Sequence, residues 1–230
     1  MQSSKPRGSS YHHGNLRQAL LNAGLELVTE KGINGFTLRE VARRAGVSHN
    51  APYAHFRDRA DLVATLAAQG LHGLRDALAE ARDRTTGNAI DRLQSTGVAY
   101  VRFAIQNPAA FRLIMRPELR QTPPETGGGQ EVDRLAEEAL GVLSGALHEA
   151  AERGEISPDG LEDNILVCWS AVHGLAVLVL DQMLQQAQDQ EVDAIALAQR
   201  LTDLIARGLL STRAEDECGR DPGGPPLGYC

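Results

Sequence analysis

The chain has 230 residues, of which 42% are hydrophobic but only 4% aromatic, and its formal net charge at pH 7 is −7. This length can bury a core in one or two domains, and abundant Ala and Leu with few aromatics favour an all-helical protein. The polar N-terminus does not resemble a secretory signal peptide, and the three cysteines have the spacing of neither a disulfide framework nor a metal site. We therefore expect an all-α, cytoplasmic protein with free thiols.

The acidic total conceals a basic N-terminal segment. Residues 1–60 hold nine Lys and Arg against four Asp and Glu, a net charge of +5, so the remaining residues carry −12. A basic segment on an acidic body is typical of a protein that binds nucleic acid. Chance clustering of basic residues is the alternative, and the motif described below argues against it.

The first predicted element is a helix that follows a polar arm. Residues 1–13 are expected to be flexible, and the adjacent His12 and His13 lack the further ligands that a metal site needs. Asn15 can cap a helix that extends to Lys31, because apolar residues recur in it at the i, i+3, i+4 spacing of one buried face. We predict no metal site and one amphipathic helix in this segment.

Residues 37–56 predict two short helices joined by a tight turn. Thr37 and Glu40 have the spacing of a capping box, in which each side chain accepts a backbone N–H of the first turn. Gly46 follows Ala45 at the position where a left-handed residue commonly ends a helix. A supporting helix, a turn with a glycine and a second helix together form a helix-turn-helix motif.

The second helix of this motif is predicted from His49 to Phe56, with Ser48 as its cap. Its early residues are small or polar and its later residues are aromatic. This order suits a helix whose front enters a DNA major groove about 12 Å wide and whose rear packs on its own domain. Pro52 is compatible with a helix here because it lies in the first turn.

The rest of the chain is predicted to be helical, with two irregular segments. The loop 117–130 is rich in Pro and Gly, and the tail 212–230 is expected to be disordered. Helices are predicted from Asp58 to a break at 85–88, and over 89–106, 108–115, 131–153, 157–187 and 191–211.

One of these predicted helices is apolar on all sides. Between Ile165 and Leu180 it has no charged residue, yet sixteen such residues are short of a membrane span. A helix of this kind must be buried on several sides, which in a small helical protein indicates a subunit interface. The chain is thus expected to form about nine helices, with a three-helix DNA-binding domain over 14–75 and a ligand-binding and dimerisation domain over 76–211.

Two patterns of residues connect the chain to a known family. The first pattern consists of Thr37, Ala42, Ala45-Gly46-Val47-Ser48, Tyr53, His55-Phe56, Arg57-Asp58-Arg59 and Leu62. With these residues the chain resembles the tetracycline-repressor (TetR) family of transcription regulators. The second pattern, residues 107–115 with Trp169 to Gly174, resembles the TetR-type regulatory domain named for its Trp-His-Gly signature. The two resemblances together cover most of residues 15–210.

The resemblance implies a repressor or activator that binds a near-palindromic operator as a homodimer, with its second helices in major grooves about 34–36 Å apart. Phosphate contacts would supply most of the affinity, and base edges would supply the sequence preference. Phosphate contacts are assigned to Thr37, Ser48, Tyr53, His55 and Arg59. Base contacts are assigned to Arg39, His49, Asn50 and Ala51, because Arg can pair with guanine, Asn with adenine and Ala with a thymine methyl group.

Each of these assignments has a structural alternative. Thr37 and Ser48 can act as helix caps alone. Tyr53 and His55 can belong to the packing of the domain, and Arg39 can be a solvated surface residue.

The resemblance also implies a small-molecule effector that binds the C-terminal domain and releases the DNA. Because this region is poor in charge, we expect a mainly apolar effector. The candidate lining residues are Tyr100, Phe103, Phe111, Met115, Trp169 and His173. The alternative is that these side chains form core, with His173 as a hydrogen-bonded core histidine.

Two other classes of function fit the sequence less well. An enzyme would show a nucleophile elbow, a metal triad, a phosphate loop or a dinucleotide fingerprint, and no such motif or cofactor site is found. Cys168 and His173 lie five residues apart, about 140° around a helix axis, and so do not face each other. A dimeric helical module that binds a ligand or protein without DNA is the other alternative, and the capping box and basic segment argue against it.

Overall fold

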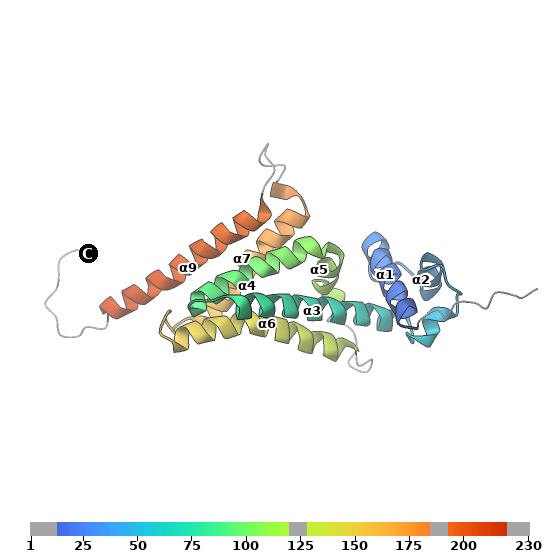
Figure 1. Ribbon diagram of the computed structural model, residues 1–230, viewed down its shortest axis with the longest axis horizontal. Coiled ribbons are helices and arrows are strands. Elements are labelled where there is room, and N and C mark those ends of the chain that lie inside the picture. The colour runs from blue at the N-terminus through green and yellow to red at the C-terminus, as the bar shows by residue number, and fades with distance from the viewer. Residues whose placement is uncertain (1–12, 120–127, 185–192, 220–230) are drawn as a thin grey trace, which may run out of the picture. The chain divides into compact units, whose positions relative to one another are not determined.

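The computed structural model describes residues 13–119, 128–184 and 193–219 (Figure 1). Within these ranges the chain forms eight α-helices, two short 3-10 helices and no strand, which confirms the predicted all-α fold. The helices are grouped in two compact units. The first unit holds the described residues up to Gln69 together with those between Arg112 and Val132, and the second unit holds the others.

The first unit is built around the N-terminal helices. Its elements are α1 (His13–Lys31), α2 (Leu38–Arg44), the 3-10 helix η1 (Ala51–Ala54), the start of α3 (Arg59–Arg84), the end of α5 (Pro108–Ile114) and the 3-10 helix η2 (Pro117–Leu119). The apolar residues of α1, α2 and α3 that recur at helical spacing are buried, among them Leu20, Val41 and Leu62, each 0% exposed. The predicted arm lies outside the described residues, apart from His13, at which α1 begins.

The second unit contains α4 (Ala89–Gln106), α7 (Leu161–Leu180) and α9 (Ala194–Gly219), together with most of α3 and the start of α5. It also holds most of α6 (Gly128–Glu152), whose first residues, up to Val132, belong to the first unit. Helix α4 packs against both α7 and α9 (Figure 1). The close approach depends on Gly97, because a Cβ at this position would lie 2.8 Å from Thr202 Cγ2 and 3.3 Å from Val172 Cγ1. A common core contains Ala89, Ile90, Leu93, Leu143, Ala146, Leu147, Ala150, Ile156, Ile165, Cys168, Ala206 and Leu209.

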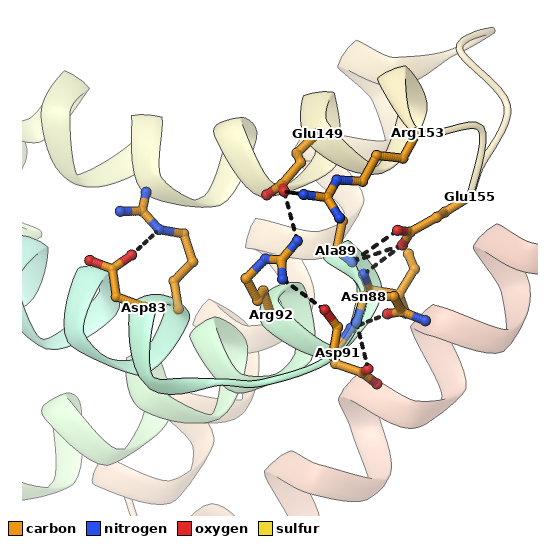
Figure 2. A network of polar contacts seen from close by, with 11 residues as sticks. Asp83, Asn88, Ala89, Asp91, Arg92, Glu149, Arg153 and Glu155 are labelled. Carbon is orange, nitrogen blue, oxygen red and sulfur yellow. Dashed lines mark hydrogen bonds and ion pairs between the residues drawn. The ribbon is translucent and has the colours of Figure 1, made fainter.

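A polar network fixes the start of α4 to the segment that follows α6 (Figure 2). The Glu155 carboxylate accepts the backbone N–H groups of Ala89 at 2.9 Å and Ile90 at 3.1 Å, which are unpaired donors of the first helical turn. Arg92 donates to the Glu149 carboxylate at 2.6 Å. The N-terminus of a helix favours a negative charge, so Glu155 acts as a cap supplied from a distant part of the chain.

Several helix ends differ from the prediction for identifiable reasons. Helix α7 begins at Leu161 rather than near Ser157, because Gly160 before it has a left-handed φ of 70°. It ends at Leu180 rather than near residue 187, since Gln182 has a φ of 56°. Helix α9 continues to Gly219, past the predicted end at residue 211. Residues 120–127 of the predicted loop and 220–230 of the predicted tail lie outside the described residues.

The second helix of the helix-turn-helix motif is shorter than predicted. Only Ala51–Ala54 are helical, and they form a 3-10 helix in place of the α-helix expected from His49 to Phe56. Pro52 has no N–H group to donate, while the Tyr53 and His55 N–H groups bond three residues back, to Asn50 at 3.2 Å and Pro52 at 2.9 Å. The cap position falls on Asn50, not Ser48, and no side chain caps this helix.

Candidate nucleic-acid interface

The supporting helix α2 begins and ends as its sequence predicts. The Thr37 N–H donates to Glu40 Oε2 at 2.9 Å, and the Glu40 N–H donates to Thr37 Oγ1 at 3.3 Å, which completes the capping box. At the other end Gly46 has a φ of 69°, and the Val47 N–H bonds to the Ala42 carbonyl at 3.0 Å. This Schellman arrangement sets the direction in which the chain leaves α2.

Charged side chains join α2 to α1 at both ends. Lys31 Nζ lies 2.6 Å from Glu40 Oε1, and the Arg44 guanidinium bonds both oxygens of Glu30 at 2.7 Å and Glu26 Oε2 at 3.0 Å. The hydrogen bond from Lys31, followed by those from Thr37, lowers the pKa of Glu40 to about 2. The orientation of α2 on α1 is thus held by ion pairs as well as by the buried apolar residues.

The residues predicted to contact base edges lie on the surface of the first unit. Arg39 projects from α2, while His49 and Asn50 lie in the turn before η1, and all three are exposed. Ala51, the first residue of η1, is half-buried. The polar side chain of Asn50 and the small side chain of Ala51 therefore lie next to each other at the start of η1. Polar and small side chains are the kinds that can contact base edges.

The residues predicted to contact phosphates fall into two groups. Thr37, Ser48 and Tyr53 are exposed, and Tyr53 keeps 53% of its surface accessible. His55 and Arg59 are half-buried, with the His55 ring 6.3 Å from that of Phe56. These side chains come from the two ends of the motif, and the hydroxyl of Thr37 also takes part in the capping box.

Arg59 has an intramolecular partner. Its guanidinium donates to the Asn34 backbone carbonyl at 2.7 Å and to Asn34 Oδ1 at 2.9 Å. These two bonds tie the loop before α2 to the start of α3. A phosphate contact by Arg59 would have to share the guanidinium with Asn34.

Two further cations were not singled out by the sequence. Arg43 is exposed one helical turn after Arg39, and within the described residues neither side chain has a hydrogen bond or ion pair. The i, i+4 spacing that places them on one face of α2 was the available signal. Arg17 of α1 is also exposed and lies over the Phe56 ring, 5.5 Å from its centroid. It reaches the end of the motif only through the tertiary packing.

Four of the six candidate effector residues form one cluster in the second unit. The Tyr100 hydroxyl lies 3.0 Å from His173 Nδ1, Trp169 stacks on His173 at 5.5 Å, and Phe111 lies 5.6 Å from Tyr100, edge to face. Burial raises the pKa of Tyr100 and lowers that of His173, so a neutral hydroxyl faces a neutral imidazole. Phe111 and Tyr100 are buried, at 1% and 5% exposed, whereas Trp169 and His173 are half-buried, so only the latter two present part of their surface.

The other two candidate effector residues have different surroundings from those of the cluster. The Phe103 ring packs against Gly73, where a Cβ would be 3.3 Å away, and lines a shallow groove of about 440 Å³ with residues of α3 and α4. Met115 is half-buried and belongs to the first unit.

Helices α7 and α9 expose apolar side chains on the sides turned away from the core. Leu166 and Val167 of α7 are 57% and 58% exposed, and Leu204 of α9 is 61% exposed. A Cβ added to Gly174 would meet no atom within 4 Å. We call this surface the α7–α9 face. By length and composition α7 could cross a membrane, but this is weak evidence, because a core helix of a soluble protein passes the same test.

Comparison with known proteins agrees with both resemblances in the sequence. Residues 20–66 match the family model of bacterial regulatory proteins of the tetR family, and residues 93–205 match that of the tetracyclin repressor-like C-terminal domain. A protein of unknown function from Rhodococcus sp. RHA1 is 30% identical over 88% of this chain and 100% of its own, with a TM-score of 0.72.

Two regulators have a similar structure. A bacterial regulatory protein in the tetR family from Rhodococcus RHA1 is 25% identical over 84% of this chain and 96% of its own, with a TM-score of 0.69. The transcriptional regulator FadR from Bacillus subtilis, solved in complex with stearoyl-CoA, is 19% identical over 83% and 98%, with a TM-score of 0.66, and shares the fold.

Proposed function

The chain belongs to the tetR family of bacterial regulatory proteins and is therefore a DNA-binding regulator of transcription and not an enzyme; from this we propose that it is a cytoplasmic repressor. It binds a near-palindromic operator as a homodimer and leaves it when a small, mainly apolar effector binds. The observation that carries the proposal is the exposed pair His49-Asn50 with the half-buried Ala51, presented between a capped supporting helix and Tyr53.

We propose that the exposed and half-buried side chains of the motif have different roles in DNA binding, according to their chemistry. Hydroxyl, imidazole and guanidinium groups contact phosphates and supply most of the affinity, from Thr37, Ser48, Tyr53, His55 and Arg59. Base edges are contacted by Arg39, His49, Asn50 and Ala51. Arg43 adds a phosphate contact, since it is exposed on the same face as Arg39.

The α7–α9 face is the proposed dimer interface. Exposed leucine and valine side chains on two adjacent helices favour burial against a second copy, because removing apolar surface from water is stabilising. Gly174 adds to this because its missing side chain permits a close approach of two helices. A two-fold dimer would present two motifs to successive major grooves.

The aromatic cluster is the proposed site of effector recognition. The half-buried Trp169 supplies apolar contact area, and the half-buried His173 imidazole, bonded to the Tyr100 hydroxyl, supplies a polar group that orients a ligand. The buried Phe111 packs against His173 and supports this surface. Phe103 and Met115 have less support because they lie outside the cluster.

Selection of bound sequences from random duplex DNA by the purified full-length protein tests the proposal. Enrichment of a near-palindromic site, with half-sites about one helical turn or slightly more apart, is expected. A folded, dimeric protein that enriches no sequence would contradict it and favour the alternative of a dimeric ligand-binding module without DNA.

A further inference from the structure

Helix α2 is held at both of its ends by side chains of α1. At its start Glu40 bonds Lys31 at 2.6 Å, and at its end Arg44 bonds Glu30 through its two terminal guanidinium nitrogens, Nη1 and Nη2, each at 2.7 Å. Glu26 adds a third oxygen to Arg44, at 3.0 Å. A two-pronged guanidinium–carboxylate pair fixes orientation as well as distance, because both groups are planar.

Arg44 differs in this respect from the other arginines of α2. It is the final residue of the helix, and two carboxylates neutralise its charge. Arg39 and Arg43 are exposed and, within the described part of the chain, have no acidic partner. A count of charges along the sequence does not distinguish these three arginines. The structure shows that Arg39 and Arg43 are available to contact phosphates, whereas Arg44 is paired within the protein.

We propose that Arg44 is a positioning residue for DNA binding: it holds α2 on α1 through Glu30 and Glu26, and so sets the direction of the turn that presents Asn50. The proposal rests on the proposed function. On this proposal Glu30 and Glu26 favour DNA binding, although their negative charges repel the phosphates of DNA.

Removing the Glu30 side chain distinguishes a positioning role of Arg44 from a phosphate contact, because the two predict opposite changes in DNA affinity. If Arg44 contacted a phosphate, removing Glu30 would free the guanidinium and remove a repulsive charge, so DNA would bind more tightly. If Arg44 positions α2, the loss of Glu30 leaves the helix less constrained and DNA binds more weakly.

The experiment measures the DNA dissociation constant of the full-length protein against salt concentration, for wild type, Arg44→Ala, Glu30→Ala and the double variant. We expect each single variant to bind about threefold to tenfold more weakly and the double variant to bind hardly more weakly still. The slope of log affinity against log salt concentration should be the same in these variants as in the wild type. Arg43→Ala is the matched control, and it should reduce that slope by about one.

Tighter binding by Glu30→Ala, or a slope reduced by about one in Arg44→Ala, would overturn the proposal. Circular dichroism at the assay temperature establishes that each variant is folded, so that a change in affinity is not a loss of fold. Hydrogen exchange of the α2 amides without DNA should become faster in both single variants. Unchanged exchange would refute the positioning role, whereas a wild-type protein that binds no duplex would refute the proposed function alone.

Discussion

Individual side chains of the helix-turn-helix motif divide into those that build it and those left free to bind. Glu40 completes the capping box and Gly46 adopts the turn conformation, so both build the motif, while Thr37 takes part in the capping box in addition to its proposed phosphate contact. Asn50 and Tyr53 are exposed and shape no helix end through their side chains. This division makes the binding assignments testable by single substitutions that leave the fold intact.

Substitutions at Asn50 and Tyr53 should separate base contacts from phosphate contacts. Asn50→Ala should relax the preference at one base-pair position, where about 1–3 kcal/mol of discrimination is lost. Tyr53→Phe should weaken binding to all sequences to a similar extent, since phosphates are the same in every site. Selected-site profiles and titrations with one specific and one random duplex check both, and an Asn50→Ala profile identical to wild type contradicts the assignment.

The hydrogen bonds that Glu40 accepts, first from Lys31 and then from Thr37, should make the first unit sensitive to acid. The pKa of Glu40 falls from an ordinary 4.5 to about 2 on folding, so its charge stabilises the fold fully above pH 4.5. This contribution is lost as the pH falls from about 4.5 towards 2, because the unfolded chain then takes up a proton first. Thermal unfolding of wild type and Glu40→Gln should differ at pH 7 and converge towards pH 2, and a constant difference across this range would disprove the linkage.

Helix packing in the second unit depends on where small residues lie. Gly97 of α4 faces Thr202 and Val172 with no space for a Cβ, whereas Gly141 of α6 has no neighbouring atom within 4 Å. The absence of a side chain therefore has a different effect at each of these two glycines. At Gly97 the missing side chain permits contact between helices, and at Gly141 it only lowers helix propensity.

Alanine at these two glycines should therefore change stability in opposite directions. Gly97→Ala should lower the free energy of unfolding by about 1–3 kcal/mol, because Thr202 and Val172 must move. Gly141→Ala serves as the control and should raise it by about 0.5–1 kcal/mol. Urea denaturation measures both, and an equal effect of the two substitutions would show that α4, α7 and α9 repack freely.

At the scale of the whole molecule, two surfaces are left uncovered by the part of the chain that the structure describes. One is the exposed motif of the first unit, and the other is the apolar α7–α9 face of the second. A regulator that recognises a two-fold site needs both, because dimerisation doubles the contacts to DNA.

A charge on the α7–α9 face should break the proposed dimer without unfolding the subunit. Leu166→Glu or Leu204→Glu should weaken self-association at least about tenfold, because each introduces a charge into an apolar contact. Leu140→Glu is the control, since Leu140 is 42% exposed but lies on α6. Sedimentation of the three variants checks the prediction, which would be wrong if Leu140→Glu alone produced monomers.

The sequence by itself determined the features that depend on neighbours along the chain. The capping box of Thr37 and Glu40, the turn at Gly46 and the limits of helix 89–106 follow from local hydrogen bonding and helical periodicity, and each was predicted. The predicted length of the second helix of the motif was too great. Helical periodicity does not show that the segment around Pro52 forms 3-10 hydrogen bonds in place of α-helical ones.

Only the tertiary structure decided which side chains of distant segments meet. The pairing of Arg44 with Glu30, the bonds of Arg59 to Asn34 and the joining of Tyr100 with His173 all depend on how helices pack. Helical spacing places a residue on a face of its own helix but does not specify the partner opposite. For this reason the sequence indicated DNA binding, while the division of arginines between structure and contact required the packed helices.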